Sequence, residues 1–146
     1  LQTRDFDVAR AKEALAVIER NARLQAQLID DLLDISRIIQ GKLSLKTDAV
    51  SLAFVISSAL ETVRLCAEAK QIKIETILEP GRETIIGDAA RLQQVVWNLL
   101  SNAVKFTPQG GKILVKLEQE NSGNSSFAKL TVTDNGKGIK PEFLPY

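Results

Sequence analysis

The longest uninterrupted stretch of the sequence limits the folds open to this chain. No proline or glycine occurs in residues 6–40, and Gly41 follows where helices commonly end. A helix of that length would measure ~50 Å. A compact chain of 146 residues has a radius of gyration of only ~15 Å. The helix therefore cannot lie within one globule built from the remaining residues.

The long stretch also carries an apolar row that needs a partner. Apolar or small residues recur about every 3.5 residues, at Ala11, Leu15, Ile18, Ala22, Ile29, Leu32 and Ile39. One arrangement is a long helix bent across a sheet. We favour the other, a helical hairpin that pairs with a second copy of the chain.

Beyond Gly41 the pattern alternates between strands and helices. Polar–apolar alternation predicts strands at residues 42–46, 72–76, 84–87, 112–120 and 127–133. Helical periodicity predicts helices at residues 51–70 and 91–108, the second capped by Asp88. Residues 121–126 are expected to form a hairpin loop. The predicted fold class is therefore α+β, a long helix followed by a two-layer α/β sandwich.

One face of the second predicted helix carries side chains suited to a ligand. Spacings of 3, 4, 4 and 3 residues place five polar residues on that face, namely Arg91, Gln94, Asn98, Asn102 and Lys105. We expect the opposite face to pack on the sheet through Leu92, Val95, Val96, Leu99 and Ala103. The polar row is either a solvated face or a binding face, since Asn offers an oxygen to Mg²⁺ and Lys a charge to phosphate. The row alone does not decide between them.

A glycine-rich turn follows the last predicted strand directly. Its sequence is Asp134-Asn135-Gly136-Lys137-Gly138-Ile139. As an isolated motif, Asp-Asn-Gly is first of all a turn signal. The functional interpretation is a carboxylate at a strand end that accepts a hydrogen bond from the amino group of adenine. The glycines would then let the backbone approach the base.

Composition excludes several classes of site. The chain has no histidine and one cysteine, Cys66, which excludes a Ser-His-Asp triad, a Cys-His pair, an internal disulfide and the usual zinc sites. We expect Cys66 to be buried, because its helical run is rich in apolar residues. A net charge of +1 argues against a nucleic-acid partner or a basic membrane surface. No apolar run is long enough to predict a membrane span.

The two polar motifs occur in an order that resembles a known family. Residues 98–107, a strand hairpin and residues 134–139 together resemble the N box and G1 box of sensor histidine kinases of two-component systems. Residues 88–94 look like the entry to the N-box helix, and residues 29–37 are similar to the second helix of the dimerisation and phosphotransfer hairpin. The resemblance implies that residues 1–41 are that hairpin helix and residues 42–146 the N-terminal part of a Bergerat-fold ATP-binding domain.

The resemblance also implies roles for individual residues. Asn102 matches the Mg²⁺ ligand, Lys105 a phosphate contact and Phe106 an aromatic ring beside adenine. Asp134 matches the carboxylate that reads adenine, and two glycines shape the pocket. Asn98 occupies the position where related gyrase- and chaperone-type ATPases carry a Glu that activates water, and an amide cannot be that base. The implied nucleotide-binding set is Asn98, Asn102, Lys105, Phe106, Asp134, Gly136 and Gly138.

Two parts of the family pattern are missing from the sequence. The family's phosphate acceptor is a histidine on the first hairpin helix, and the chain contains none. The family also continues beyond the position of Tyr146 into a mobile ATP lid and a second glycine-rich loop. We therefore expect a fragment truncated at both ends. It should hold no catalytic residue, fail to autophosphorylate, and bind nucleotide weakly at most.

The implied function is that of the parent kinase. It would bind ATP and Mg²⁺, phosphorylate its own histidine and pass the phosphoryl group to an Asp of a response regulator. The implied partners are a second copy, bound through the long helix, and a receiver domain. The implied location is cytoplasmic, with membrane contact only through other parts. One rival is a non-catalytic dimerisation or interaction module that keeps the fold. Another is an ATPase of the wider superfamily, against which Asn98 counts.

Overall fold

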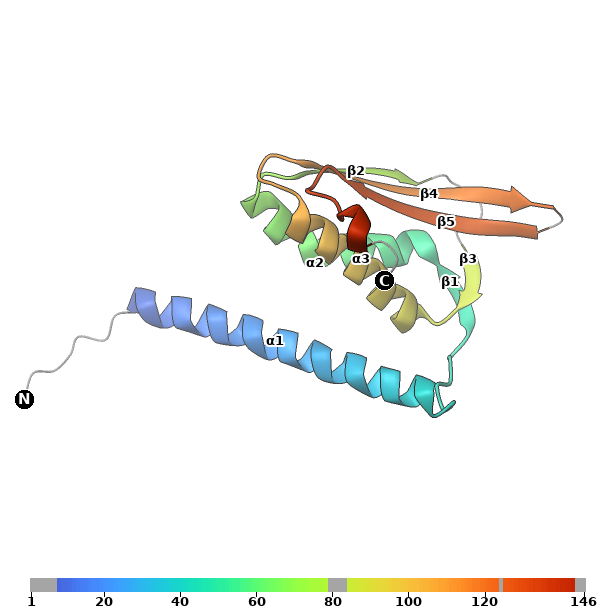
Figure 1. Ribbon diagram of the computed structural model, residues 1–146, viewed down its shortest axis with the longest axis horizontal. Coiled ribbons are helices and arrows are strands. Elements are labelled where there is room, and N and C mark those ends of the chain that lie inside the picture. The colour runs from blue at the N-terminus through green and yellow to red at the C-terminus, as the bar shows by residue number, and fades with distance from the viewer. Residues whose placement is uncertain (1–7, 79–83, 124, 144–146) are drawn as a thin grey trace, which may run out of the picture. The chain divides into compact units, whose positions relative to one another are not determined.

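The computed structural model describes residues 8–78, 84–123 and 125–143 (Figure 1). The chain divides into two compact units, Leu1–Ser44 and Leu45–Tyr146. The first contains one helix, and the second combines helices with strands, which confirms the predicted α+β class. Within the described ranges, no helix is long and apolar enough to cross a membrane.

The first unit is built on α1, Val8–Ile39, a helix of 32 residues. It ends in a Schellman motif, in which the Lys42 N–H donates to the Arg37 carbonyl at 2.8 Å and the Gly41 N–H to the Ile38 carbonyl at 3.0 Å. Gly41 has a φ of +64°, which favours glycine at this position. The predicted long helix and its glycine cap are thus confirmed. Its first two predicted residues, 6 and 7, lie outside the described ranges.

Large apolar side chains of α1 are exposed to solvent in the single chain. They are Leu15, Val17, Ile18, Leu28, Ile29, Leu32, Leu33, Ile35, Ile38 and Ile39. Soluble monomers seldom expose so long an apolar surface, so a helix like this is expected to have a partner. Its pairing with a second copy stays a prediction.

The second unit has a three-stranded sheet, a two-stranded sheet and two main helices. In the larger sheet, β2 (Lys73–Leu78) pairs in parallel with β4 (Lys112–Ser122), and β4 pairs antiparallel with β5 (Ser125–Asp134). The smaller sheet joins β1 (Asp48–Ser51) and β3 (Thr84–Gly87). Figure 1 shows α2 (Leu52–Ala69) and α3 (Ala89–Phe106) along one face of the larger sheet. A short 3₁₀ helix, Pro141–Phe143, follows β5.

The core lies between these two helices and the larger sheet. The most fully buried apolar side chains come from α2, α3 and β4, and they include Ile56, Val96, Leu100, Ile113 and Val115. Burial alternates along β4, so that one strand face meets the helices. The two-layer arrangement expected for residues 42–146 is therefore present.

The face of α3 that meets the core differs from the predicted one. Val95 and Leu99, both predicted to pack on the sheet, are 54% and 43% exposed, whereas Leu100 is fully buried. The buried residues of α3 are Val96, Leu100, Ala103 and Val104. Apolar residues cover more than half of the circumference of α3. Periodicity therefore could not show which edge of that surface faces the sheet.

Two predicted details of the strands are wrong. Residues 42–46 form no strand, and β1 begins at Asp48 instead. The partner strand β3 is only four residues long and pairs from Asp48↔Gly87 to Ser51↔Thr84. That ladder leaves no partner for an earlier segment. The hairpin loop is also shorter than predicted, because β4 continues to Ser122 and β5 starts at Ser125.

Cys66 is exposed, so its predicted burial is wrong. Helix α2 buries a stripe formed by Leu52, Val55, Ile56, Ala59, Val63 and Ala67. Cys66 is adjacent in sequence to the last of these and falls beside the stripe. The apolar composition of a helix therefore does not show which of its side chains, such as the Cys66 thiol, are buried.

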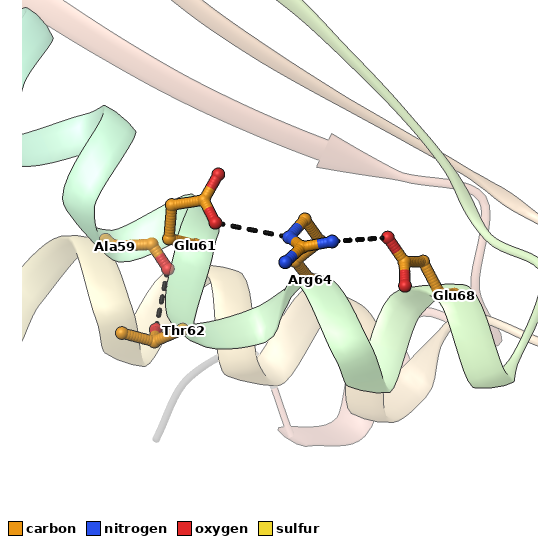
Figure 2. A network of polar contacts seen from close by, with 5 residues as sticks. All are labelled: Ala59, Glu61, Thr62, Arg64 and Glu68. Carbon is orange, nitrogen blue, oxygen red and sulfur yellow. Dashed lines mark hydrogen bonds and ion pairs between the residues drawn. The ribbon is translucent and has the colours of Figure 1, made fainter.

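The outer side of α2 carries a network of polar contacts (Figure 2). Arg64 lies between two carboxylates, with its Nε 3.1 Å from Glu61 Oε2 and its Nη1 3.0 Å from Glu68 Oε1. The Thr62 hydroxyl donates to the Ala59 carbonyl at 2.6 Å. Exposed ion pairs at this spacing contribute little to stability. The orientation of α2 is therefore set by its buried stripe.

Candidate functional site

The candidate site is built around α3, and its first turn is fixed by Asp88. The Asp88 Oδ1 accepts hydrogen bonds from the backbone N–H groups of Ala90 and Arg91, at 3.1 and 3.2 Å. Its Oδ2 accepts one from the Lys46 backbone N–H at 3.0 Å. The bond from Lys46, followed by that from Arg91, holds the pKa of the Asp88 carboxyl below its usual range. Asp88 therefore caps α3 and ties it to the segment before β1.

A turn at the end of β5 lies against the other end of α3. The Asp134 Oδ1 accepts a hydrogen bond from the Gly136 N–H at 2.8 Å. A Cβ on Gly136 would lie 2.6 Å from the Phe106 carbonyl oxygen, closer than real side chains approach. Position 136 therefore requires glycine, because the turn contacts the backbone of α3 there.

Asn135 holds the same turn to the start of β4. Its Oδ1 accepts a hydrogen bond from the Lys112 N–H at 2.8 Å, and its backbone N–H donates to the Lys112 carbonyl at 3.2 Å. The side chain of Asn135 is thus used within the protein, while Asp134 keeps one oxygen for other contacts. Among the described residues, Asp134 Oδ2 accepts no hydrogen bond.

A cavity of about 660 Å³ opens between α3, the end of β5 and the residues that follow it. We call it the larger cavity. It is lined by Leu99, Asn102, Ala103, Phe106, Val132, Asp134, Lys137, Gly138, Ile139, Lys140 and Phe143. Most of this lining is apolar, and a few polar groups converge on it. Sites for small molecules commonly have that character.

A second cavity, of about 630 Å³, adjoins the first. We call it the smaller cavity, and its lining is Lys70, Lys105, Phe106, Thr107, Pro108, Gln109, Asn135, Gly136 and Lys137. Phe106 and Lys137 line both cavities. The ammonium nitrogens of Lys105 and Lys137 lie 5.1 and 5.2 Å from the centre of the Phe106 ring. Positive charge therefore gathers around this ring, where the cavities meet.

The structure divides the predicted site residues among three places. Asn102, Phe106, Asp134 and Gly138 line the larger cavity. Lys105 and Gly136 line the smaller one, which also contains Phe106. Asn98 is exposed and lines neither cavity. Six of the seven residues thus lie around two adjoining cavities, although they come from segments about 30 residues apart in sequence.

Several lining residues were not predicted. Leu99 was assigned to the core, yet it precedes Asn102 by one turn and lines the larger cavity. Lys137 lies between the two predicted glycines, so its position in the motif was a usable signal. Lys70 is remote from both motifs in sequence, and no local pattern marks it.

The lining residues fit an adenine nucleotide with its metal. Asp134 Oδ2 is an acceptor suited to an amino group, and Phe106 offers a ring face. Asn102 supplies one amide oxygen. The described ranges contain no cluster of three His, Cys, Asp or Glu side chains that could hold a metal alone. Mg²⁺ is commonly held by few protein oxygens together with substrate phosphates. The donor set therefore fits a metal that arrives with a phosphate ligand.

Comparison with known sequences assigns the second unit to a family. Residues 87–146 match the model described as histidine kinase-, DNA gyrase B-, and HSP90-like ATPase. The hybrid signal transduction histidine kinase D of Dictyostelium discoideum is 39% identical over 166 residues, covering 95% of this chain. That match covers 11% of the relative. The chain thus corresponds to a small part of this relative's length.

Solved structures of histidine kinases have the same fold. The mycobacterial sensor histidine kinase MprB is 36% identical, with a TM-score of 0.56 over 66% of this chain and 60% of that chain. Full-length ShkA in complex with AMPPNP is 25% identical, with a TM-score of 0.72 over 94% of this chain and 29% of that chain. ThkA in complex with the response regulator protein TrrA, at 18% identity, has a TM-score of 0.66 over 96% of this chain and 40% of that chain. The chain therefore belongs to the sensor histidine kinases, and residues 87–146 fall within their ATPase domain.

Proposed function

We propose that this chain binds Mg²⁺-ATP as part of a sensor histidine kinase. The whole kinase would phosphorylate one of its own histidines and pass the phosphoryl group to an Asp of a response regulator. The observation that carries this proposal is the larger cavity, which gathers Asn102, Phe106, Asp134 and Gly138. The ShkA structure supports it because that relative holds AMPPNP. The chain has no histidine, so the acceptor in this proposal is not one of its residues.

In this proposal the adenine lies in the larger cavity. Asp134 Oδ2 accepts a hydrogen bond from the exocyclic amino group, because Oδ1 is already bound by the Gly136 N–H at 2.8 Å. The Phe106 ring covers the base, and Gly138 lets the backbone come close. The apolar lining excludes water from around the base. This end of the site therefore selects the nucleobase.

The phosphates would then point toward Asn102, Lys105 and Lys137. Bound Mg²⁺ would supply positive charge that neutralises the phosphates, and the amide oxygen of Asn102 is its protein ligand in this proposal. The two ammonium groups near Phe106 add positive charge on the protein side. These groups contribute by positioning and by neutralising charge, which are the main sources of catalysis in phosphoryl transfer.

Asn98 bears on the choice between a kinase and an ATPase. An amide cannot take a proton from water, so this position offers no base for hydrolysis. Asn98 also lines neither cavity. The amide at this position therefore favours transfer to a protein side chain over hydrolysis.

The proposed partners follow from α1 and from the family. The exposed apolar side chains of α1 are suited to pairing with a second copy of the chain. A response regulator is the proposed recipient of the phosphoryl group, since one related structure is a complex with such a protein. We place the site on the cytoplasmic side of the cell, as the resemblance implies.

The substitution Asp134→Asn tests the adenine contact. The Gly136 N–H needs an acceptor, so the amide oxygen should take the place of Oδ1 and the NH₂ group that of Oδ2. The NH₂ group of the new side chain would then face the amino group of adenine, and both are donors. The affinity for Mg²⁺-ADP should therefore fall about tenfold or more. NMR titration of the 146-residue chain measures this even for weak binding.

Asp48→Asn, at an exposed position of β1, is the matched control and should bind like the wild type. Equal affinities of the wild type and Asp134→Asn would sink the adenine contact. A wild-type chain that dimerises but shows no shifts with Mg²⁺-ADP would favour the non-catalytic interaction module instead.

A further inference from the structure

The end of α3 presents backbone carbonyls that the helix itself cannot satisfy. The Val104 carbonyl would normally accept a hydrogen bond from the N–H of residue 108, but that residue is Pro108 and has none. Thr107 has a φ of −72° and a ψ of 132°, so the chain leaves the helix there. Donors for the last carbonyls must therefore come from elsewhere in the protein or from water.

Lys70 supplies those donors. Its Nζ donates to the carbonyl oxygens of Val104 at 2.8 Å, Lys105 at 3.0 Å and Thr107 at 3.1 Å. An ammonium group has three N–H donors, and all three are used here. The group also lies at the negative end of the α3 dipole, where a cation is favourable. One side chain thus closes the C-terminus of α3.

The backbone of Lys70 is itself held in place. Lys70 is the C-cap of α2, which ends in a Schellman motif with bonds from Gln71 N–H to the Glu68 carbonyl and from Ile72 N–H to the Ala67 carbonyl, both 2.9 Å. The Lys70 carbonyl accepts a further bond from the Gly110 N–H at 2.9 Å. Lys70 is therefore tied to the end of α3 mainly through its side chain, and to the segment after α3 through its carbonyl.

The end of α3 carries residues of the proposed nucleotide site. Asn102, Lys105 and Phe106 lie in the last turns of α3, and the backbone of Phe106 lies against Gly136. We propose that Lys70 is a positioning residue for the nucleotide, which sets the end of α3 against the turn at Asp134. The proposal rests on the proposed function, since it concerns how the same site is held.

Lys70 also lines the smaller cavity, so a direct contact with phosphate is the competing explanation. The hydrogen bonds argue against it, because the ammonium has no donor left after the three carbonyls. The ammonium groups near the Phe106 ring belong to Lys105 and Lys137. Lys70 therefore acts through the helix end.

The test compares Lys70→Met and Lys70→Arg with the wild type, using the ¹³C- and ¹⁵N-labelled chain. Lys129→Met is the control, since its ammonium meets Glu120 at 3.2 Å on the exposed hairpin. Three quantities are measured for each chain: the carbonyl ¹³C shifts of Val104, Lys105 and Thr107, the affinity for Mg²⁺-ADP, and the thermal midpoint. All titrations are run well below the lowest midpoint.

Lys70→Met should move the three carbonyl signals and weaken Mg²⁺-ADP binding about tenfold, because site residues on α3 lose their alignment. Lys70→Arg keeps the charge and several N–H donors in a planar group of different geometry, so its affinity should lie between those of Lys70→Met and the wild type. The control should change neither. Lys70→Arg also keeps the test informative if Lys70→Met does not fold.

Weaker binding with unmoved carbonyl signals would show a direct phosphate contact and overturn the proposal. Moved signals with unchanged affinity would overturn it as well, since the cap would then be structural only. A wild-type chain that shows no shifts with Mg²⁺-ADP would overturn the proposed function instead. The carbonyl signals would still show whether Lys70 holds the helix end.

Discussion

At the scale of single residues, two side chains act mainly on the backbone ends of α3. Asp88 accepts hydrogen bonds at the N-terminus, and Lys70 donates them at the C-terminus. Asp88 could be predicted from sequence because a cap directly precedes its helix. Lys70 could not, because it lies 34 residues from the nearest carbonyl that it caps.

The substitution Asp88→Ala should lower the thermal midpoint at pH 7 by removing the cap of α3. The pKa of Asp88 is held below its usual range in the folded protein. Its contribution to stability is therefore complete above the unfolded pKa of about 3.9 and is lost as pH falls through the lower folded value. The difference in midpoint between wild type and variant should thus narrow in acid.

Ser51→Ala provides a cap control that does not titrate, because the Ser51 hydroxyl accepts from the Phe54 N–H at the start of α2. Its effect on the midpoint should be the same at every pH where the protein folds. Thermal unfolding followed by circular dichroism measures both. If the difference in thermal midpoint between the wild type and Asp88→Ala stays constant as the pH falls into the acid range, the charged carboxylate does not have the proposed role.

At the scale of elements, the rotation of α3 decides what the site contains. The buried stripe through Val96, Leu100 and Val104 turns Leu99, Asn102 and Phe106 toward the larger cavity. The binding face of α3 is therefore partly apolar. It includes Asn102 from the predicted polar row, but Asn98 of that row lies outside both cavities.

Alanine substitutions at three positions of α3 test this rotation. Leu100→Ala should reduce the free energy of unfolding by about 2–5 kcal/mol, because it leaves a cavity in the core. Val95→Ala, at an exposed position, should change it by less than about 0.5 kcal/mol. Leu99→Ala should affect stability little and weaken Mg²⁺-ADP binding. Urea denaturation and NMR titration provide the measurements. Equal losses of stability for Leu100→Ala and Val95→Ala would show that the buried face of α3 has been assigned wrongly.

The elements that could be predicted are those with a strong local pattern. Helix α1, its Gly41 cap and the alternation along β4 follow from periodicity and from glycine at a left-handed position. The prediction of a strand at residues 42–46 was wrong, because pairing with a neighbouring strand, and not alternation, decides where a short strand forms. The site motifs were visible in the sequence. Lys70 and the apolar side chains that complete the cavities depend on tertiary contacts.

At the scale of the whole molecule, the first unit has an apolar surface that the chain itself leaves exposed. Leu32, in the C-terminal part of α1, is 67% exposed. The proposed dimer would bury such side chains between two copies of α1. Association should therefore depend on α1 and not on the second unit.

Leu32→Glu tests that dependence. A charge inside an apolar helix pair would be buried without a partner, so the dissociation constant of the dimer should rise about tenfold or more. Leu65→Glu is the matched control, since Leu65 on α2 is 70% exposed. Sedimentation equilibrium across a range of concentrations measures both. A dimer weakened by Leu65→Glu and untouched by Leu32→Glu would assign the interface to the second unit.

The parallel pairing of β2 with β4 also bears on how the protein folds. The two strands pair from Lys73↔Lys112 to Leu78↔Leu117, and the connection between them contains β3 and α3. Parallel neighbours require such a crossover, and loop closure must precede the contacts that repay it. The centre of the sheet and the helix that carries Asn102 should thus form in the same kinetic step. Under the proposed function, nucleotide would then bind only after this crossover has closed.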